Sequence, residues 1–178
     1  MARATIRQEL KNTRSASEAI ITNIVTPHDT NYLGTLFGGT LMAWIDTAAG
    51  ICAMRYAQTV VVTAAVDALQ FAQPVKLGWV VTARARINYV GNTSCEVGVR
   101  VTAEDTQTSK SVHAASAYLT MVALDKQGTP CPMPPLLVQS DDEKRRQRAA
   151  ETRRALRLAL QRRTAAATKT SANHKPQQ

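Results

Sequence analysis

The chain has 178 residues, of which 44% are hydrophobic, and its 22 Lys plus Arg against 13 Asp plus Glu give a net charge of +9. This length is enough for one domain with a sizeable core, and no apolar stretch approaches the roughly 20 residues of a membrane-spanning helix. The first 18 residues lack an apolar segment, so they do not resemble a secretory signal, while an organelle transit peptide stays open. We therefore expect a cytoplasmic protein. Residues 141–178 hold 11 Lys plus Arg and 4 Asp plus Glu, so most of the basicity belongs to the tail.

The first predicted elements are a strand and a long helix. Residues 1–18 are expected to be flexible, and a short strand is expected near residues 19–25. From about Gly38 to Gln58, apolar residues recur at spacings of three and four, which predicts a helix with one packed face. Asp46 borders that face, which consists of Leu41, Trp44, Ile45, Ala48, Ile51, Cys52 and Arg55.

Four β-rich segments follow the helix, at about residues 59–71, 79–89, 93–102 and 111–125, and turn residues such as Pro74, Gly78 and Gly91 separate them. In the second segment the residues alternate with period two, so one face carries Val81, Ala83, Ala85, Ile87 and Tyr89. The order of elements predicts an α+β domain over residues 19–138, in which an antiparallel sheet wraps around one long central helix.

The segment from Asn31 to Asp46 has the residues of a candidate active site. Gly38 and Gly39 stand where the helix begins, so several backbone N–H groups are open to a ligand oxygen, helped by a dipole of roughly half a positive charge. Asp46 follows eight residues after Gly38, which is roughly 12 Å along the helix axis. One helix therefore cannot bring both groups to one carbonyl, whereas two antiparallel copies across a twofold axis can.

Short motifs in a fixed order extend over residues 20–137. They are the segments 27–31, Gly34, 37–39, 45–46, 62–67, Phe71, Pro74, Gly78, 90–94, 115–118 and 132–135. Through these segments the chain resembles the acyl-CoA hydrolases of the hotdog superfamily, which include bacterial short-chain acyl-CoA thioesterases and the brain-type cytosolic acyl-CoA hydrolase. The resemblance implies a hotdog fold and the hydrolysis of acyl-CoA thioesters to free acid and CoA, without a cofactor or metal, since CoA is part of the substrate. It also implies a homodimer as the catalytic unit, commonly assembled as a trimer of dimers.

The resemblance also assigns roles within these segments. It places the catalytic acid at Asp46 and the catalytic asparagine at Asn31, with the backbone N–H of Gly38 or Gly39 as the oxyanion donor. Asn31 would orient the water or the carbonyl. Asp46 of the second subunit would take the proton of the water or attack directly to form an anhydride, and both routes stay open. Expected substrate contacts are Phe37, Thr63, Asn92, Thr93 and Ser94.

Two other function classes stay in view. A thioester hydratase or dehydratase of this superfamily usually needs a histidine beside an acid, but the helix has none and His28 is the sole candidate. A non-catalytic CoA-binding module would be expected to lack Asn31 or Asp46, and both are present. We interpret His28 and His113 as surface residues. The three cysteines lack the spacing of a metal site and are expected to be reduced core thiols.

Residues 139–178 form the basic tail. Ser140 followed by three acids predicts the start of a helix that continues to about Arg163, with an unstructured end. Leu156 and Leu160 provide only a thin apolar stripe, so we interpret this helix as solvated and packed lightly on a neighbouring subunit. The alternatives are capture of the acidic CoA nucleotide and binding of other polyanions. Binding to nucleic acid or to a membrane is not expected.

Overall fold

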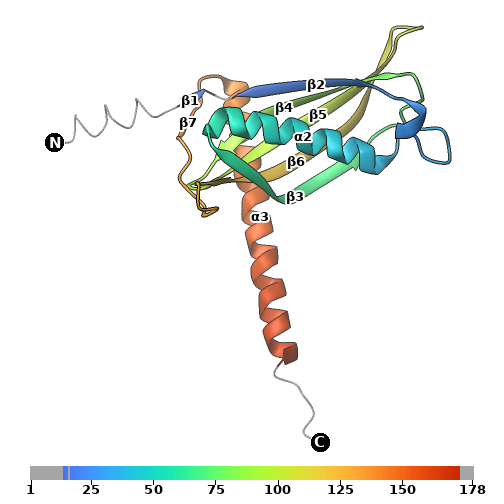
Figure 1. Ribbon diagram of the computed structural model, residues 1–178. Helices are drawn as coiled ribbons and strands as arrows, with labels where there is room; N and C mark the ends of the chain where they lie inside the picture. The colour runs from blue at the N-terminus through green and yellow to red at the C-terminus, as the bar shows by residue number, and fades with distance from the viewer. Residues whose placement is uncertain (1–13, 16, 173–178) are drawn as a thin grey trace, which may run out of the picture.

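The computed structural model describes residues 14–15 and 17–172, and Figure 1 labels their elements. Within these described residues there are seven strands, a 3-10 turn, η1 (Pro27–Asp29), and two helices, α2 (Gly38–Ala57) and α3 (Asp141–Ala172). Most of the predicted segment 1–18, and the end of the tail from residue 173, lie outside the described residues. The strands are β1 (Arg14–Ser15), β2 (Glu18–Ile24), β3 (Val60–Phe71), β4 (Val80–Val90), β5 (Ser94–Asp105), β6 (Lys110–Leu124) and β7 (Leu136–Leu137).

Five of the strands form one sheet in the order β2-β4-β5-β6-β3, and every neighbouring pair is antiparallel. The helix α2 lies across one face of this sheet, which confirms the predicted α+β architecture (Figure 1). Strands β1 and β7 form a separate parallel pair that the sequence pattern did not indicate. Within the described residues, no helix combines the length and the apolar character needed to span a membrane.

The core lies between α2 and the inner face of the sheet. Its strand residues are the inward positions of each alternating pattern, such as Val97, Val99 and Val101 of β5. The helix ends at Ala57 because Gln58 adopts the left-handed conformation, with φ of 55°. Arg55, which we had placed on the packed face, is exposed instead and donates to the Glu18 carbonyl at 3.2 Å. The buried helix residues are Leu41, Ile45, Ala48, Ala49, Cys52, Ala53 and Tyr56.

A β-bulge changes the direction of Tyr89. Ile87 pairs with Val97, but the next partners are Tyr89 and Glu96, so one extra residue of β4 has no partner in β5. Tyr89 therefore joins Glu96 on the outer face of the sheet, and our placement of Tyr89 on the inner face with Ile87 was wrong. Period-two alternation fails there because a bulge shifts every following side chain to the opposite face.

The helix α3 begins as predicted at Ser140. The Ser140 hydroxyl accepts from the Glu143 N–H at 3.2 Å, and the Glu143 carboxylate accepts from the N–H groups of Gln139 and Ser140 at 2.8 and 3.0 Å. These backbone hydrogen bonds, reinforced by Arg86, lower the pKa of Glu143. The helix then continues to Ala172, beyond the predicted end near Arg163.

The first half of α3 packs against the outer face of this chain's own sheet, and the second half projects beyond it (Figure 1). Leu156 and Leu160 do not make this contact, because they are 67% and 65% exposed. Arginines make it instead. Arg153 contacts Glu96 of β5 through two hydrogen bonds of 3.0 and 2.6 Å, and Arg157 contacts Asp67 of β3. The first half of α3 therefore packs on its own chain, which we did not predict, while the contact of the leucine stripe with a neighbouring subunit stays a prediction.

Candidate active site

The carboxylate of Asp46 lies on the exposed side of α2, beside the edge strand β3. Thr63 of β3 donates its hydroxyl proton to Asp46 Oδ1 at 2.5 Å. This contact fixes the direction of the carboxylate, because a β-branched side chain on a strand has few rotamers. Oδ2 has no hydrogen-bond partner among the described residues, so it remains available to a water or a substrate.

The beginning of α2 provides the second part of the site. Phe37 occupies the N-cap position and its side chain cannot accept a hydrogen bond, so the N–H groups of Gly38, Gly39 and Thr40 have no partner among the described residues. The Phe37 ring covers Gly39 so closely that an added Cβ would lie 2.4 Å from its Cε1 atom. On the other side, the tip of the Phe71 ring would be 3.4 Å from a Cβ on Gly38. Two aromatic rings thus flank open amide donors, an arrangement that suits a thioester oxygen on an apolar acyl group.

Asn31 lies before α2 in a closed loop. Its Oδ1 accepts from the N–H groups of Leu33 and Thr35 at 2.9 and 3.2 Å, and its Nδ2 lies 3.0 Å from the Thr35 hydroxyl. The carboxamide therefore shapes the loop that precedes Phe37, as an Asx turn does. Phe37 in turn donates its N–H to the Asp29 carbonyl at 2.8 Å, which anchors the helix start to η1.

The turn with Asn92, Thr93 and Ser94 lies at the far end of the sheet. Ser94 pairs with Val122, close to the end of β6, whereas Phe71 beside the helix start pairs with Ala115. Within one chain, α2 spans about 30 Å between these ends. One protomer therefore does not bring this turn together with Gly38 and Gly39.

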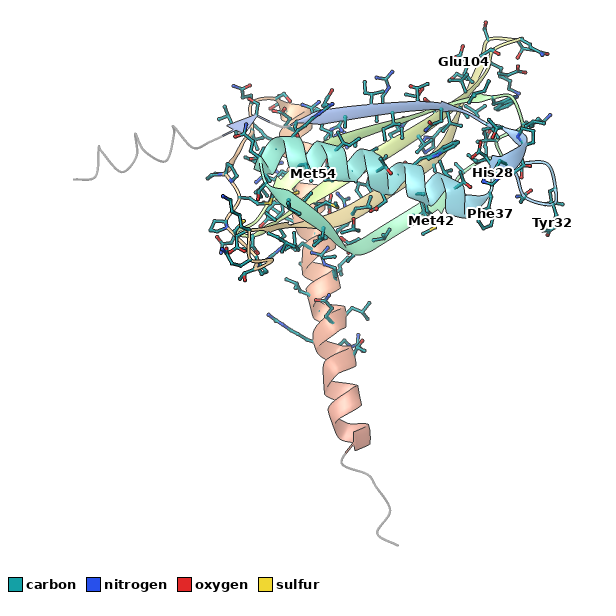
Figure 2. All side chains as sticks on the ribbon, in the orientation of Figure 1. His28, Tyr32, Phe37, Met42, Met54 and Glu104 are labelled. Carbon is teal, nitrogen blue, oxygen red and sulfur yellow. The ribbon has the colours of Figure 1, made fainter. Side chains whose placement is uncertain are left out.

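Among the described residues of one protomer, no element covers the side of α2 that carries Asp46. Met42 and Met54, one turn before Asp46 and two turns after it, are 45% and 44% exposed. Figure 2 shows them along the helix, with Phe37 beside its beginning. The edge strand β3 adds Val66, which lies on the face of the sheet that α2 covers and is also exposed. Exposed apolar side chains along a helix and a sheet edge are typical of a subunit interface.

The remaining candidates are structural. His113 lies on β6, where its Nε2 is 3.1 Å from the Ser116 hydroxyl, whereas Asp46 lies on α2. All three cysteines are free. Burial raises the pKa of Cys52 and raises the pKa of Cys95 to about 12, so both are core thiols. Among the described residues, no group of three His, Cys, Asp or Glu side chains could hold a metal ion.

Two contributors were not predicted from the sequence as parts of this site. Thr35 completes the hydrogen-bonded loop around Asn31, and Phe71 forms the wall beside Gly38. Asn31 and Thr35 are four residues apart, a spacing that is compatible with a closed turn, so their contact could have been predicted from the sequence. The position of Phe71 depends on sheet geometry and had no local signal.

Comparisons with known proteins point to one family. Residues 33–110 match the family model described as Thioesterase superfamily. The chain is also 39% identical over 127 residues to the uncharacterized acyl-CoA thioester hydrolase YkhA of Bacillus subtilis, a match that covers 71% of this chain and 74% of YkhA.

Solved structures agree with this match. An acyl-CoA hydrolase from Staphylococcus aureus, in complex with butyryl coenzyme A, coenzyme A and coenzyme A disulfide, is 37% identical with a TM-score of 0.79, covering 87% of this chain and 94% of that chain. Further structures of the S. aureus enzyme carry one asparagine, one aspartate or one threonine changed to alanine. The hexameric thioesterase y2039 from Yersinia pestis is 36% identical with a TM-score of 0.62, covering 66% of this chain and 96% of that chain. With its sheet wrapped around α2, this chain belongs to the acyl-CoA thioester hydrolase family of the hotdog-fold thioesterase superfamily.

Proposed function

We propose that this protein hydrolyses acyl-CoA thioesters, adding water across the thioester bond to release a carboxylic acid and CoA. One observation carries the proposal: the helix α2 bears both open N–H groups, at Gly38 and Gly39, and a carboxylate, Asp46, which Thr63 orients. The S. aureus relative with bound butyryl coenzyme A supports the same class of substrate. No cofactor is required by this chemistry.

In the proposed reaction, the thioester oxygen accepts a hydrogen bond from Gly38 or Gly39. Such donors stabilise the oxyanion more than the ground-state carbonyl, by about 3 kcal/mol for one well-placed donor. Asp46 takes the proton of the attacking water, or it attacks the carbonyl carbon and forms an anhydride that water then opens. With Asp46 as the base, the thiolate of CoA leaves when the tetrahedral intermediate collapses. With Asp46 as the nucleophile, the thiolate leaves as the anhydride forms, before water opens that anhydride. In both routes the thiolate then receives a proton.

The spacing of residues in a relative supports these assignments. The asparagine, aspartate and threonine that were replaced in the S. aureus hydrolase are separated by 15 and 17 residues. The same spacings separate Asn31 from Asp46 and Asp46 from Thr63. We had expected Thr63 to contact the substrate, and its hydrogen bond to Asp46 supports a role in positioning the carboxylate instead.

We propose that the catalytic unit is a homodimer. Gly38 and Asp46 lie on one helix roughly 12 Å apart along its axis, so a single chain cannot direct both at one carbonyl. A second antiparallel copy would bring its Asp46 to the amides of the first and would cover the exposed Met42 and Met54. The hexameric relative from Y. pestis supports assembly of such dimers into a trimer of dimers. A cytoplasmic location also remains a proposal.

The test is a thiol-release assay with a series of acyl-CoA substrates from acetyl to palmitoyl. Asp46→Asn should lower kcat at least about a hundredfold, because a positioned base contributes roughly 10² to 10⁴. Glu104→Gln is the matched control, since it removes one carboxylate from an exposed position of β5 and should leave kcat unchanged. Asp46→Asn acting at the wild-type rate would exclude Asp46 as base or nucleophile.

Thr63 provides a second test of the same site. Thr63→Val removes the donor to Asp46 and should lower kcat while KM changes little, whereas Thr63→Ser keeps a hydroxyl and should restore most of the rate. A purely structural threonine would show the opposite pattern, with the valine variant close to wild type because valine suits a strand. The hydratase alternative is disfavoured because α2 carries no histidine.

A further inference from the structure

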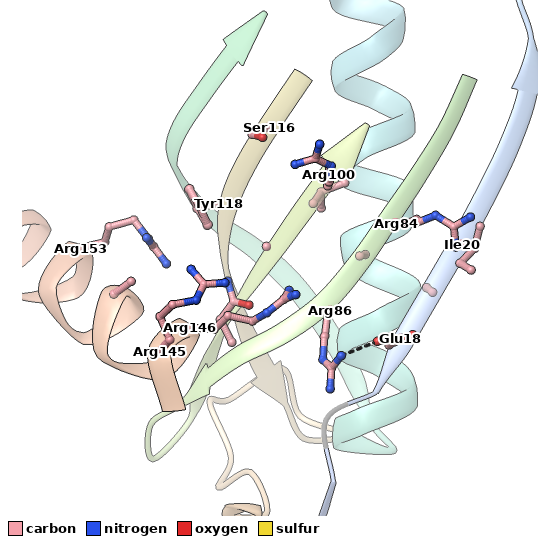
Figure 3. A pocket seen from close by; sticks show the side chains of 16 residues that line it. Glu18, Ile20, Arg84, Arg86, Arg100, Ser116, Tyr118, Arg145, Arg146 and Arg153 are labelled. Atoms are coloured by element: carbon pink, nitrogen blue, oxygen red, sulfur yellow. Dashed lines mark ion pairs between the residues drawn. The ribbon is translucent and has the colours of Figure 1, made fainter. Parts of the chain in front are cut away.

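The outer face of the sheet carries a cavity of about 400 Å³, on the side opposite α2. The first turns of α3 form one wall, and strands β2, β4, β5 and β6 form the floor (Figure 3). Gly98 contributes no side chain to that floor, and an added Cβ there would lie 2.5 Å from Nδ2 of Asn88. The cavity is therefore a built hollow of the fold, separated by the sheet from Asp46 and the helix start.

Positive charge dominates the lining. Six arginines line the cavity, namely Arg84, Arg86, Arg100, Arg145, Arg146 and Arg153. Four carboxylates pair with some of them. Arg86 contacts Glu18 and Glu143, Arg153 contacts Glu96, and Arg145 and Arg146 both contact Asp142. Two positive charges therefore remain in excess around the cavity.

Two of the lining arginines, Arg84 and Arg100, have no carboxylate within 4.0 Å among the described residues. Both are exposed to solvent. They are direct partners across β4 and β5, so their Cβ atoms lie about 5 Å apart. Like charges directly opposite on a sheet are destabilising, and Figure 3 shows the two head groups pointing away from each other. Both side chains are exposed, so they can turn toward one anion, whose negative charge would offset this repulsion.

The neighbours of this pair suit a phosphate-bearing ligand. Ser116, the partner of Arg100 on β6, adds a hydroxyl to the lining, and Arg145 and Arg146 approach from α3 with one shared acid between them. Guanidinium groups bind phosphate oxygens through paired N–H donors, and several of them around one hollow favour more than one negative charge. A single carboxylate would leave much of this charge unmatched.

We propose that this cavity binds a diphosphate group, with Arg84 and Arg100 as the principal ligands. The group has two natural sources, a free phosphorylated metabolite and the nucleotide end of CoA, and both present the same chemistry to the arginines. This inference does not depend on the proposed hydrolysis, because the site lies on the other face of the sheet from Asp46.

The first experiment is a calorimetric titration of the full-length protein with inorganic diphosphate at physiological salt, with chloride at matched ionic strength as the reference. Arg84→Gln and Arg100→Gln should each weaken binding about tenfold or more, because hydrogen bonds to charged groups are strong when both partners are ionised. Arg162→Gln is the matched control, since it removes the same charge from an exposed part of α3 outside the cavity. Equal losses in all three variants, or no saturable binding in the wild type, would overturn the proposal.

Folding and assembly are measured in parallel. Without ligand, Arg84→Gln and Arg100→Gln should keep or raise the Tm, because each removes one member of a repelling pair. If either variant dissociates the oligomer while diphosphate binding is unchanged, this face is a contact between subunits and the proposal is wrong.

A kinetic arm separates the two sources. If diphosphate raises the KM for butyryl-CoA in the wild type but not in the double variant Arg84→Gln/Arg100→Gln, the cavity holds the nucleotide end of CoA. If diphosphate binds with no change in KM, the cavity takes an independent phosphorylated ligand. Both results support a diphosphate site and assign its source.

Discussion

The substitution Arg153→Met tests how α3 is attached to the sheet. The guanidinium of Arg153 makes two hydrogen bonds to Glu96 and lies 3.6 Å from the centre of the Tyr118 ring. The Glu96 side chain is only 5% exposed, and it has one further donor, Asn88 Nδ2 at 3.1 Å. Methionine keeps the apolar stem of the arginine but leaves this carboxylate buried without its cation.

Breaking a buried ion pair on one side costs about 3–5 kcal/mol, and loss of the cation–π contact adds about 1 kcal/mol. The free energy of unfolding should fall by this amount if α3 stays in place. Release of the first half of α3 would let water reach Glu96. The free-energy cost of releasing the helix therefore sets an upper limit to the loss in the free energy of unfolding. In that case amide hydrogen exchange in the first half of α3 should speed up.

Chemical denaturation at fixed protein concentration and hydrogen exchange together measure both outcomes. Arg154→Met is the matched control, because Arg154 is exposed and lies 5.9 Å from the Tyr89 ring without an ion pair among the described residues. The double variant Arg153→Met/Glu96→Gln should recover part of the lost stability, since it removes the isolated charge. Equal stability of Arg153→Met and Arg154→Met within about 0.5 kcal/mol, with unchanged exchange in α3, would show that the Arg153–Glu96 pair does not hold the helix on the sheet.

Three further predictions concern the site and the core. Mixing inactive Asp46→Asn with inactive Asn31→Ala should restore about half of the sites in each heterodimer, and no recovery after verified subunit exchange would indicate sites within one chain. Gly39→Ala should lower kcat at least about tenfold in the thiol-release assay with little change in Tm. The added Cβ would meet the Phe37 ring at 2.4 Å and displace the ring from the open amides. An unchanged kcat would argue against a role of the Phe37 ring in the site. In the native protein iodoacetamide should modify Cys131 and spare the two buried cysteines, whose raised pKa keeps them protonated; mass spectrometry would contradict this if all three thiols were alkylated at one rate.

Local pattern determined much of the fold. The three-and-four spacing of apolar residues predicted α2 to within one residue at its end, and period-two alternation predicted β4. The β-rich run at residues 111–125 predicted the long strand β6. Ser140 and the acids after it predicted the start of α3. These signals are readable because helix and strand periodicities, caps and turns depend on residues close together in the chain.

The helix-start amides and Asp46 were also readable, because both lie on one predicted element and the spacing between them follows from helix geometry. Thr63 beside Asp46 was not predicted as its partner, since that contact joins residues 17 apart through the packing of α2 against β3. Phe71 beside Gly38 has the same origin.

The attachment of α3 was decided only by tertiary structure. Its ion pairs join residues 57 and 90 positions apart, and nothing in the tail sequence distinguishes Arg153 and Arg157 from the exposed arginines around them. Glu96 and Asp67, the acids that pair with these arginines, are buried because α3 covers them. Their burial and their ion pairs therefore form together when the chain folds. The facing of Arg84 and Arg100 likewise follows from strand register, which is set by hydrogen bonding between β4 and β5 and not by either segment alone.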